Sequence, residues 1–140
     1  MAHNVIITDA GFAKDYWTSL ISPGLETAQS IEVETIDVPS DCEPDLIFMP
    51  PHLQMIRIDF PNFADGRGFT LARLIRLLGF VGRLRAKGHI IADQYAMARR
   101  SGFDEVEISA ELAERQPEEQ WLFRAKIWQD HDYQARLRVH

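Results

Sequence analysis

The middle of the chain shows the clearest alternation of hydrophobic and polar residues. In residues 55–60 apolar side chains alternate with Arg57 and Asp59, which predicts a strand with one apolar and one charged face. A helix is expected over about residues 69–78, because leucine and isoleucine recur there at helical spacing. Gly79 follows at the position where glycine commonly ends a helix.

A second strand, helix and strand follow in the same order. We expect a short strand over residues 84–86, a helix over about 90–100 and a third strand around 106–108. Strands separated by helices of this length need crossover connections, so they should run parallel with right-handed connections. The pattern therefore predicts a parallel β–α–β–α–β unit over residues 56–108, at the centre of an α/β domain.

The three predicted strands share a charged side. Parallel strands that are covered on both faces are usually apolar throughout, whereas these strands alternate. The charged positions are Arg57, Asp59, Arg83, Arg85, Glu105 and Glu107. Their face is either open to solvent, or a polar pocket, or covered by another surface. A two-layer, a Rossmann-like and a half-barrel-like sheet all fit this pattern.

The outer thirds of the chain are less regular. Before the central unit, the expected elements are a strand at residues 5–8, a helix at 12–21, a strand-like stretch at 31–38 and a short strand or turn at 46–49. After it we expect an amphipathic helix from residue 118 to about 129, followed by a polar tail over 130–140. Trp121, Phe123 and Trp128 are expected to pack in the core rather than form an interaction surface.

Length, charge and cysteine content narrow the class of protein. At 140 residues, the chain is expected to form a single domain over residues 1–140. It has no long apolar segment and no signal-like N-terminus, so we expect a cytoplasmic protein with no membrane partner. Its only cysteine, Cys42, lies among carboxylates that disfavour the thiolate, and we interpret it as unreactive.

Charge is distributed unevenly along the chain. The net charge is −6, which argues against nucleic acid as a partner. Residues 56–108 nevertheless hold nine Lys/Arg against six Asp/Glu, a local net charge of +3. This basic centre leaves room for a small anionic ligand or an acidic partner surface.

The first candidate binding site is the loop Asp65-Gly66-Arg67-Gly68. It precedes a predicted helix, whose free N–H groups favour an anion, and Arg67, Arg73 and Arg85 could add charge-assisted bonds to sulfite, sulfate or phosphate. We favour a structural interpretation, in which Asp65 caps the helix, the glycines form the turn and the arginines pair with nearby acids. The glycine spacing matches neither a P-loop nor a dinucleotide motif, so no cofactor is expected.

The second candidate site lies at the carboxyl ends of the predicted strands, where ligands gather in open parallel sheets. Asp59 ends one strand, His89 follows the next, and Asp93 and Gln94 lie on the helix after it. Asp59, His89 and Asp93 could form an acid–base cluster, and His89 and Asp93 could face one metal ion. We favour a structural network and expect no metal. No nucleophile elbow supports a Ser/His/Asp triad, and no catalytic residue is assigned.

Three blocks of sequence together resemble a known family. They are residues 59–74 (DFPNFADGRGFTLARL), residues 84–88 (LRAKG) with Asp93-Gln94, and residues 102–104 (GFD). They are similar to the DUF934 family of uncharacterised bacterial proteins, which are often encoded beside assimilatory sulfite reductase and sulfate-activation enzymes. Ser101 stands where several relatives carry a cysteine, which argues against a thiol mechanism, and His89 where relatives often carry an acid.

The resemblance implies a pathway rather than a reaction. It favours an accessory protein of assimilatory sulfite/sulfate reduction that binds a small anion or a partner, such as sulfite reductase or a related sulfur-assimilation enzyme. One alternative is a small enzyme acting on an anionic substrate at the carboxyl ends of the strands. Another is a homo-oligomer with a structural or interaction role.

Overall fold

One mixed sheet organises the part of the chain that the structure describes. The computed structural model describes residues 4–13, 21–23, 34–43, 45 and 53–139, with side chains for all of these except 21–23 and 133–139. Within these residues, seven strands form a sheet in the order β2-β1-β7-β6-β5-β4-β3. The strands are β1 (Val5–Thr8), β2 (Gly11–Ala13), β3 (Ile21–Pro23), β4 (Thr35–Pro39), β5 (Met55–Phe60), β6 (Arg83–Gly88) and β7 (Glu105–Ile108). Strands β3 to β7 run parallel, whereas β1 is antiparallel to β7 and to β2.

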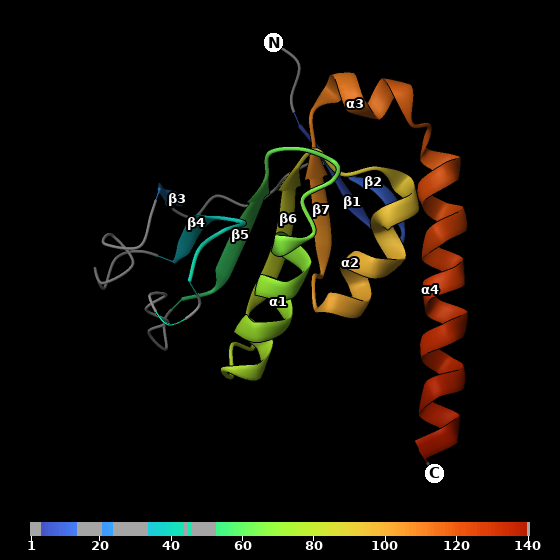
Figure 1. Ribbon diagram of the computed structural model, residues 1–140. Helices are drawn as coiled ribbons and strands as arrows, with labels where there is room; N and C mark the ends of the chain where they lie inside the picture. The colour runs from blue at the N-terminus through green and yellow to red at the C-terminus, as the bar shows by residue number, and fades with distance from the viewer. Residues whose placement is uncertain (1–3, 14–20, 24–33, 44, 46–52, 140) are drawn as a thin grey trace.

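The predicted central unit is present as β5–α1–β6–α2–β7 (Figure 1). Helix α1 spans Arg67–Leu77, and Gly79 follows it with a positive φ of 103°, as expected of a residue that ends a helix. Helix α2 is shorter than predicted and spans Tyr95–Ser101. The three residues before it form a 3₁₀ turn, η3 (Ala92–Gln94), in which the Gln94 side chain accepts the Ile91 N–H at 3.0 Å. Parallel strands joined by helices are therefore confirmed.

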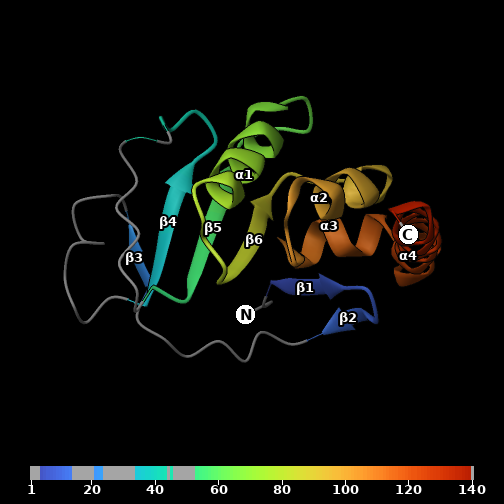
Figure 2. The same cartoon turned by 90° about the horizontal axis from the view of Figure 1, so that it is seen from below.

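Helices α1 and α2 lie on the same side of the sheet (Figure 2). The apolar residues of β5, β6 and β7 pack against them, and Leu71 and Ile75 of α1 are buried in the same core. The aromatic rings of Phe60 in β5, Phe69 in α1 and Phe103 in the loop before β7 pack against one another. The centroid of the Phe60 ring lies 5.0 Å from that of Phe69 and 5.9 Å from that of Phe103. This is the two-layer form of the predicted α/β sheet.

The amino-terminal prediction of a helix over residues 12–21 is wrong at both ends. Phe12 lies in β2 and Ile21 begins β3, while residues 14–20 lie outside the described residues. Gly11 adopts a φ of 104°, a left-handed conformation open to glycine, which permits a tight hairpin between β1 and β2. Propensity alone did not reveal that this hairpin pairs with β7 and so extends the sheet beyond it.

Two other predicted segments extend outside the described residues. The strand-like stretch over residues 31–38 corresponds to β4 where it is described, from Thr35 onward. The short strand or turn over 46–49 lies outside the described residues.

The carboxyl-terminal helix is longer than predicted. Helix α3 (Ala110–Arg115) is capped by Ser109, whose hydroxyl accepts the Leu112 N–H at 3.2 Å, and α4 runs from Glu118 to Val139. The helix therefore continues beyond its predicted end at about residue 129 and through the segment expected to be a polar tail, and the end of α4 extends past the rest of the domain (Figure 1). Trp121 is fully buried as predicted, but Phe123 is 59% exposed, so its placement in the core was wrong. Trp128 is half-buried, and the Arg99 guanidinium lies over its ring, 5.3 Å from the centroid of that ring.

Among the described helices, none has the length and apolar character needed to cross a membrane.

Candidate functional site

The charged face of the sheet is closed to solvent at its centre. Strand register places Asp37, Arg57, Arg85 and Glu105 side by side across β4, β5, β6 and β7. Arg85 is 1% exposed, and Glu105 and Glu107 are 2% and 3% exposed. Of the three alternatives that the sequence left for this face, exposure to solvent is therefore excluded at these residues.

Two arginines and three carboxylates form a continuous ion-pair network on this face. Arg57 binds Asp37 through two nitrogens, with Nε–Oδ1 at 2.5 Å and Nη2–Oδ2 at 2.7 Å, and its Nη1 donates to Glu107 Oε1 at 3.1 Å. Arg85 donates to the same Glu107 oxygen at 2.8 Å and to Glu105 Oε2 from Nη2 at 3.0 Å. Glu107 thus bridges two guanidinium groups, which is the geometry that stabilises charges removed from water.

The edges of this network are also paired. Asn4 donates from Nδ2 to the second Glu107 oxygen at 2.8 Å, and Arg83 forms an ion pair with Glu105. Among the described residues, Arg57, Arg83 and Arg85 balance the charges of the three carboxylates.

The network favours the charged forms of Glu107 and Arg57. Burial by itself favours the neutral acid of Glu107, but hydrogen bonds from Asn4 and Arg85 and the charge of Arg57 lower its pKa below the ordinary value. Burial likewise opposes the charge on Arg57, yet the hydrogen bonds and charge of Asp37 leave the Arg57 pKa above its ordinary value. These groups do not act as proton donors or acceptors near neutral pH.

Asp65 closes the candidate loop before α1. Its carboxylate accepts bonds from the Arg67 backbone N–H at 3.1 Å, from Arg67 Nε at 2.9 Å and from the Ser40 hydroxyl at 2.5 Å. The hydrogen bonds from Arg67, followed by the one from Ser40, hold the pKa of Asp65 well below its usual range. An internal carboxylate therefore occupies the amino end of α1, where the sequence suggested an external anion. The pairing of Arg67 with a nearby acid is as the structural interpretation expected, but the N-cap residue of α1 is Gly66, with no side-chain cap hydrogen bond, so the assignment of Asp65 as the cap was wrong.

The two glycines of this loop have different roles. A Cβ on Gly68 would come within 2.3 Å of the Phe60 ring, so Gly68 permits close contact between α1 and β5. A Cβ on Gly66 would meet nothing within 4 Å.

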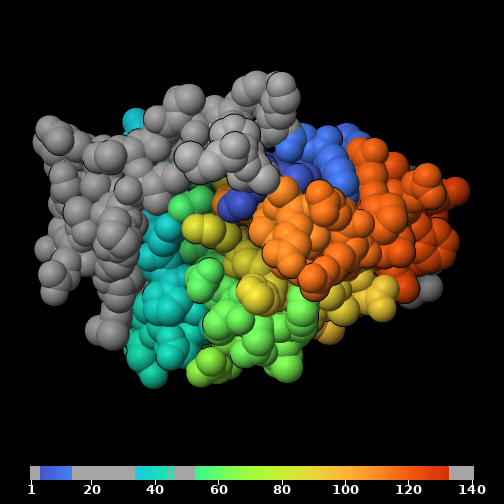
Figure 3. Space-filling model, turned by 90° about the horizontal axis from the view of Figure 1, so that it is seen from above, coloured from blue at the N-terminus to red at the C-terminus, as the bar shows by residue number. Residues whose placement is uncertain are grey.

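Residues at the carboxyl ends of β5 and β6 form separate small contacts. The exposed His89 ring lies 5.5 Å from the Phe63 ring, and Gln94 donates from Nε2 to the Phe63 carbonyl at 2.7 Å. Asp93 instead pairs with Arg124 of α4 at 2.9 Å. Figure 3, which looks onto this end of the molecule, shows α3 beside the segments that follow β5 and β6. Among the described residues, no group of three or more His, Cys, Asp or Glu side chains has a geometry suited to a metal ion.

Asp59 differs from these neighbours. It is exposed at the end of β5, lies opposite Lys87 of β6 in the strand register, and has no ion pair among the described residues. Asp59, from the predicted carboxyl-end site, and its register neighbour Lys87 therefore remain available for a ligand as far as the described contacts show.

The two candidate nucleophiles are held in structural environments. Burial, followed by the charges of Asp41 and Glu43, raises the pKa of the Cys42 thiol, in agreement with its interpretation as unreactive. Ser101 is buried, and its hydroxyl donates to the Met97 carbonyl one turn earlier at 2.8 Å.

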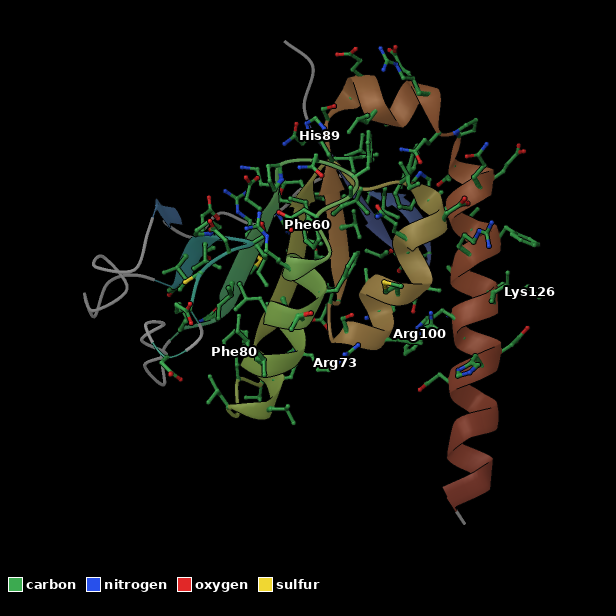
Figure 4. The ribbon with its side chains drawn as sticks, in the orientation of Figure 1. Phe60, Arg73, Phe80, His89, Arg100 and Lys126 are labelled. Atoms are coloured by element: carbon green, nitrogen blue, oxygen red, sulfur yellow. The ribbon has the colours of Figure 1, made fainter. Side chains whose placement is uncertain are left out.

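The predicted anion-binding arginines do not converge. Arg67 lies at the Asp65 loop and Arg85 within the sheet-face network, whereas Arg73 is exposed on α1 toward the other end of the molecule from His89 (Figure 4). The sequence prediction therefore combined residues from three separate places.

Sequence reasoning missed a clamp made by Arg76. Its guanidinium donates to the carbonyls of Phe80, Gly82 and Gly102 at 3.1, 2.7 and 2.8 Å, and to Asp104 at 2.9 Å. It thereby joins the end of α1 to the loops before β6 and β7. The only signal in the sequence was an arginine in the last turn of a helix, which is too common to indicate such a role.

A comparison with protein families decides the affiliation of the chain. The family described as bacterial protein of unknown function (DUF934) matches residues 31–138. The chain belongs to the DUF934 family. All three sequence blocks that suggested this family lie inside the matched range, as do β4 to β7, α1 to α3 and all of α4 except Val139. Strands β1, β2 and β3 precede it. No curated protein and no solved structure matches the chain.

The DUF934 family is described as having an unknown function, so membership in it assigns no reaction to the site. The buried network draws on Asp37, Arg57, Arg85, Glu105 and Glu107, all within the matched range.

Proposed function

We propose that this DUF934 protein is an accessory protein of assimilatory sulfite/sulfate reduction that acts by binding a protein partner, namely sulfite reductase or a related sulfur-assimilation enzyme. The pathway comes from the genes beside which relatives are often found. Partner binding is favoured over binding of a small anion by one observation: Arg67 and Arg85 are already engaged by carboxylates of the same chain.

An anion at Arg85 would face an unfavourable environment. It would have to displace or approach Glu105 and Glu107, which lie at 3.0 and 2.8 Å from the guanidinium nitrogens. Like charges at such distances repel strongly where water is excluded. Arg67 is largely exposed, but Asp65 already accepts bonds from its Nε and Nη2 and so takes the position that an anion would need. A small-anion function would therefore require the network to open.

The proposal is tested by deleting the gene in a bacterium that encodes it. We expect slower growth on sulfate or sulfite, normal growth on sulfide or cysteine, and restoration by the full chain. The purified chain should also bind purified sulfite reductase or a sulfate-activation enzyme of the same bacterium in a direct binding assay. Unchanged growth on sulfate together with absence of binding to these enzymes would overturn the proposal.

Asp59 and Lys87 support a second candidate, a small enzyme acting on an anionic substrate at the carboxyl ends of β5 and β6. The two residues lie opposite each other in the register of β5 and β6, carry opposite charges and could contact a substrate at this edge of the sheet. Full complementation of the deletion strain by a chain carrying Asp59→Asn and Lys87→Ala would rule this candidate out. Loss of complementation with unchanged partner binding would favour it.

A further inference from the structure

Five arginines gather at the end of the domain where β6 and β7 begin. We name this surface the arginine end; it comprises Arg73, Arg76, Arg83, Arg99 and Arg100. They come from the second half of α1, the start of β6 and the last turn of α2. Figure 4 shows Arg73 and Arg100 on these neighbouring helices, with His89 toward the opposite end. The link between Arg76 and the Gly102 carbonyl confirms that the two helix ends lie together.

The arginine end contains a shallow hollow. Arg76, Arg83 and Arg99 line it, together with Val81, Gly82 and Asp104, and its volume is about 760 Å³. The side chains of these three arginines are 25%, 44% and 21% exposed, so their charge reaches the surface although each also forms an ion pair within the chain. Asp104 is the one carboxylate among the residues that line the hollow.

Arg73 and Arg100 beside the hollow remain available for a partner. Both are exposed, and neither has an ion pair among the residues that the structure describes. Exposed arginines in an otherwise acidic chain of net charge −6 form a local positive field. Such a field attracts carboxylates and fixes the orientation in which an acidic surface approaches.

Aliphatic side chains next to these arginines point to a protein rather than a small ion. On α1 the outward positions Thr70, Arg73, Leu74 and Leu77 follow helical spacing, so leucines stand where a surface helix usually carries polar residues. Leu77 is 77% exposed, and Val81, which lines the hollow, is 94% exposed. A small anion would gain nothing from these groups, whereas a protein interface combines apolar contact with arginine anchors.

We propose that the arginine end is a docking surface for an acidic protein surface, whose carboxylates meet Arg73 and Arg100 and whose apolar side chains cover Leu77 and Val81. The identity of that protein as a sulfur-assimilation enzyme rests on the proposed function, but the docking surface does not. The two ideas can therefore fail separately.

The test places a photo-crosslinking amino acid at Leu77 of the full chain in the bacterium that produces it. A second chain carries the same group at Leu122 of α4, which is also exposed and lies on another part of the surface. Crosslinked proteins are identified by mass spectrometry, and the Leu77 experiment is repeated with Arg73→Glu and Arg100→Glu. The matched control carries Arg115→Glu and Lys126→Glu, which change the net charge equally on α3 and α4.

We expect one acidic protein to crosslink at position 77 and not at 122. The crosslink should fall about tenfold or more with Arg73→Glu and Arg100→Glu, and should persist in the control pair. Binding of the identified, purified protein should weaken as salt rises. Circular dichroism and thermal melting should be unchanged in both pairs, because all four side chains are at the surface.

No crosslink at position 77, or one that the two arginine substitutions leave intact, would overturn the docking surface. An arginine-dependent crosslink to an acidic protein outside sulfur assimilation would support the surface while overturning the proposed function. Binding of sulfite reductase that is unchanged when both arginines are substituted would support the proposed function while overturning the docking surface.

Discussion

Replacement of Arg85 by methionine is the sharpest test of the sheet-face network. Methionine keeps much of the side-chain volume but removes the positive charge between Glu105 and Glu107. Arg57 and Arg83 would then face three carboxylates, which leaves one buried negative charge in excess.

The size of the effect follows from burial. Removal of one partner from a buried ion pair costs about 3–5 kcal/mol, and Arg85 is 1% exposed, so solvent screens it little. A domain of this size has a free energy of unfolding of roughly 5–15 kcal/mol, so the loss is a large share of the total. It corresponds to a drop in Tm of about 10–15 °C.

A compensating substitution separates charge imbalance from lost packing. With Arg85→Met and Glu107→Gln together, Arg57 can remain paired with Asp37 and Arg83 with Glu105. The double variant should therefore be more stable than the sum of the two single changes by about 1–3 kcal/mol.

The assay is urea unfolding at pH 7, followed by the fluorescence of the buried Trp121. Arg115→Met provides the control, because Arg115 forms an exposed ion pair with Glu111 on α3 and should contribute less than about 0.5 kcal/mol. The reasoning is refuted if Arg85→Met costs less than about 1 kcal/mol, or if the effects of Arg85→Met and Glu107→Gln simply add.

Three further predictions concern other parts of the fold. Gly68→Ala should lower stability by about 1–3 kcal/mol in thermal melts, because the added Cβ would come within 2.3 Å of the Phe60 ring. The control Gly66→Ala should be neutral or slightly stabilising, because a Cβ there meets nothing within 4 Å. Equal effects of the two substitutions would contradict this prediction. Asp65 has a folded-state pKa below its unfolded value of about 3.9, so its contribution is present above that pH and is lost as the pH falls through the folded pKa. Asp65→Asn should accordingly lower stability at pH 7 and reduce the loss of stability on acidification below about pH 4; an unchanged acid profile would count against this. Arg76→Ala should cost about 2–4 kcal/mol in urea unfolding, because three loop carbonyls lose a charged donor, and a change under about 0.5 kcal/mol would show that the loops hold without it.

The central unit could be predicted because its signals are local. The alternation in β5 and the leucine spacing of α1 depend only on neighbouring residues, and both elements lie where the sequence placed them. The β1–β2 hairpin could not be predicted in this way, since it is stabilised by pairing with β7 about 100 residues away. The end of α4 was missed because its polar residues give no apolar stripe after Trp128.

The candidate site was harder to predict than the fold. Residue types indicated that Arg85 would contact an anion, but not that the anion would be Glu105 and Glu107 of its own chain. That outcome depends on strand order and register, which place partners 20 or 22 residues away on the adjacent strand. Arg73 was grouped with the wrong end of the molecule because it lies in the second half of α1, away from the loop that precedes the helix.

The pair formed by Asp37 and Arg57 also bears on how the strands find their alignment during folding. A slip of β4 along β5 by two residues would keep every apolar side chain on the helix side, so hydrophobicity alone does not reject it. Such a slip would place Asp37 opposite Met55 or Asp59 instead of Arg57, and would leave a buried guanidinium without its two-nitrogen partner. A charge pair at this position therefore discriminates between alignments that the core would accept equally, and it selects the native register as the strands assemble.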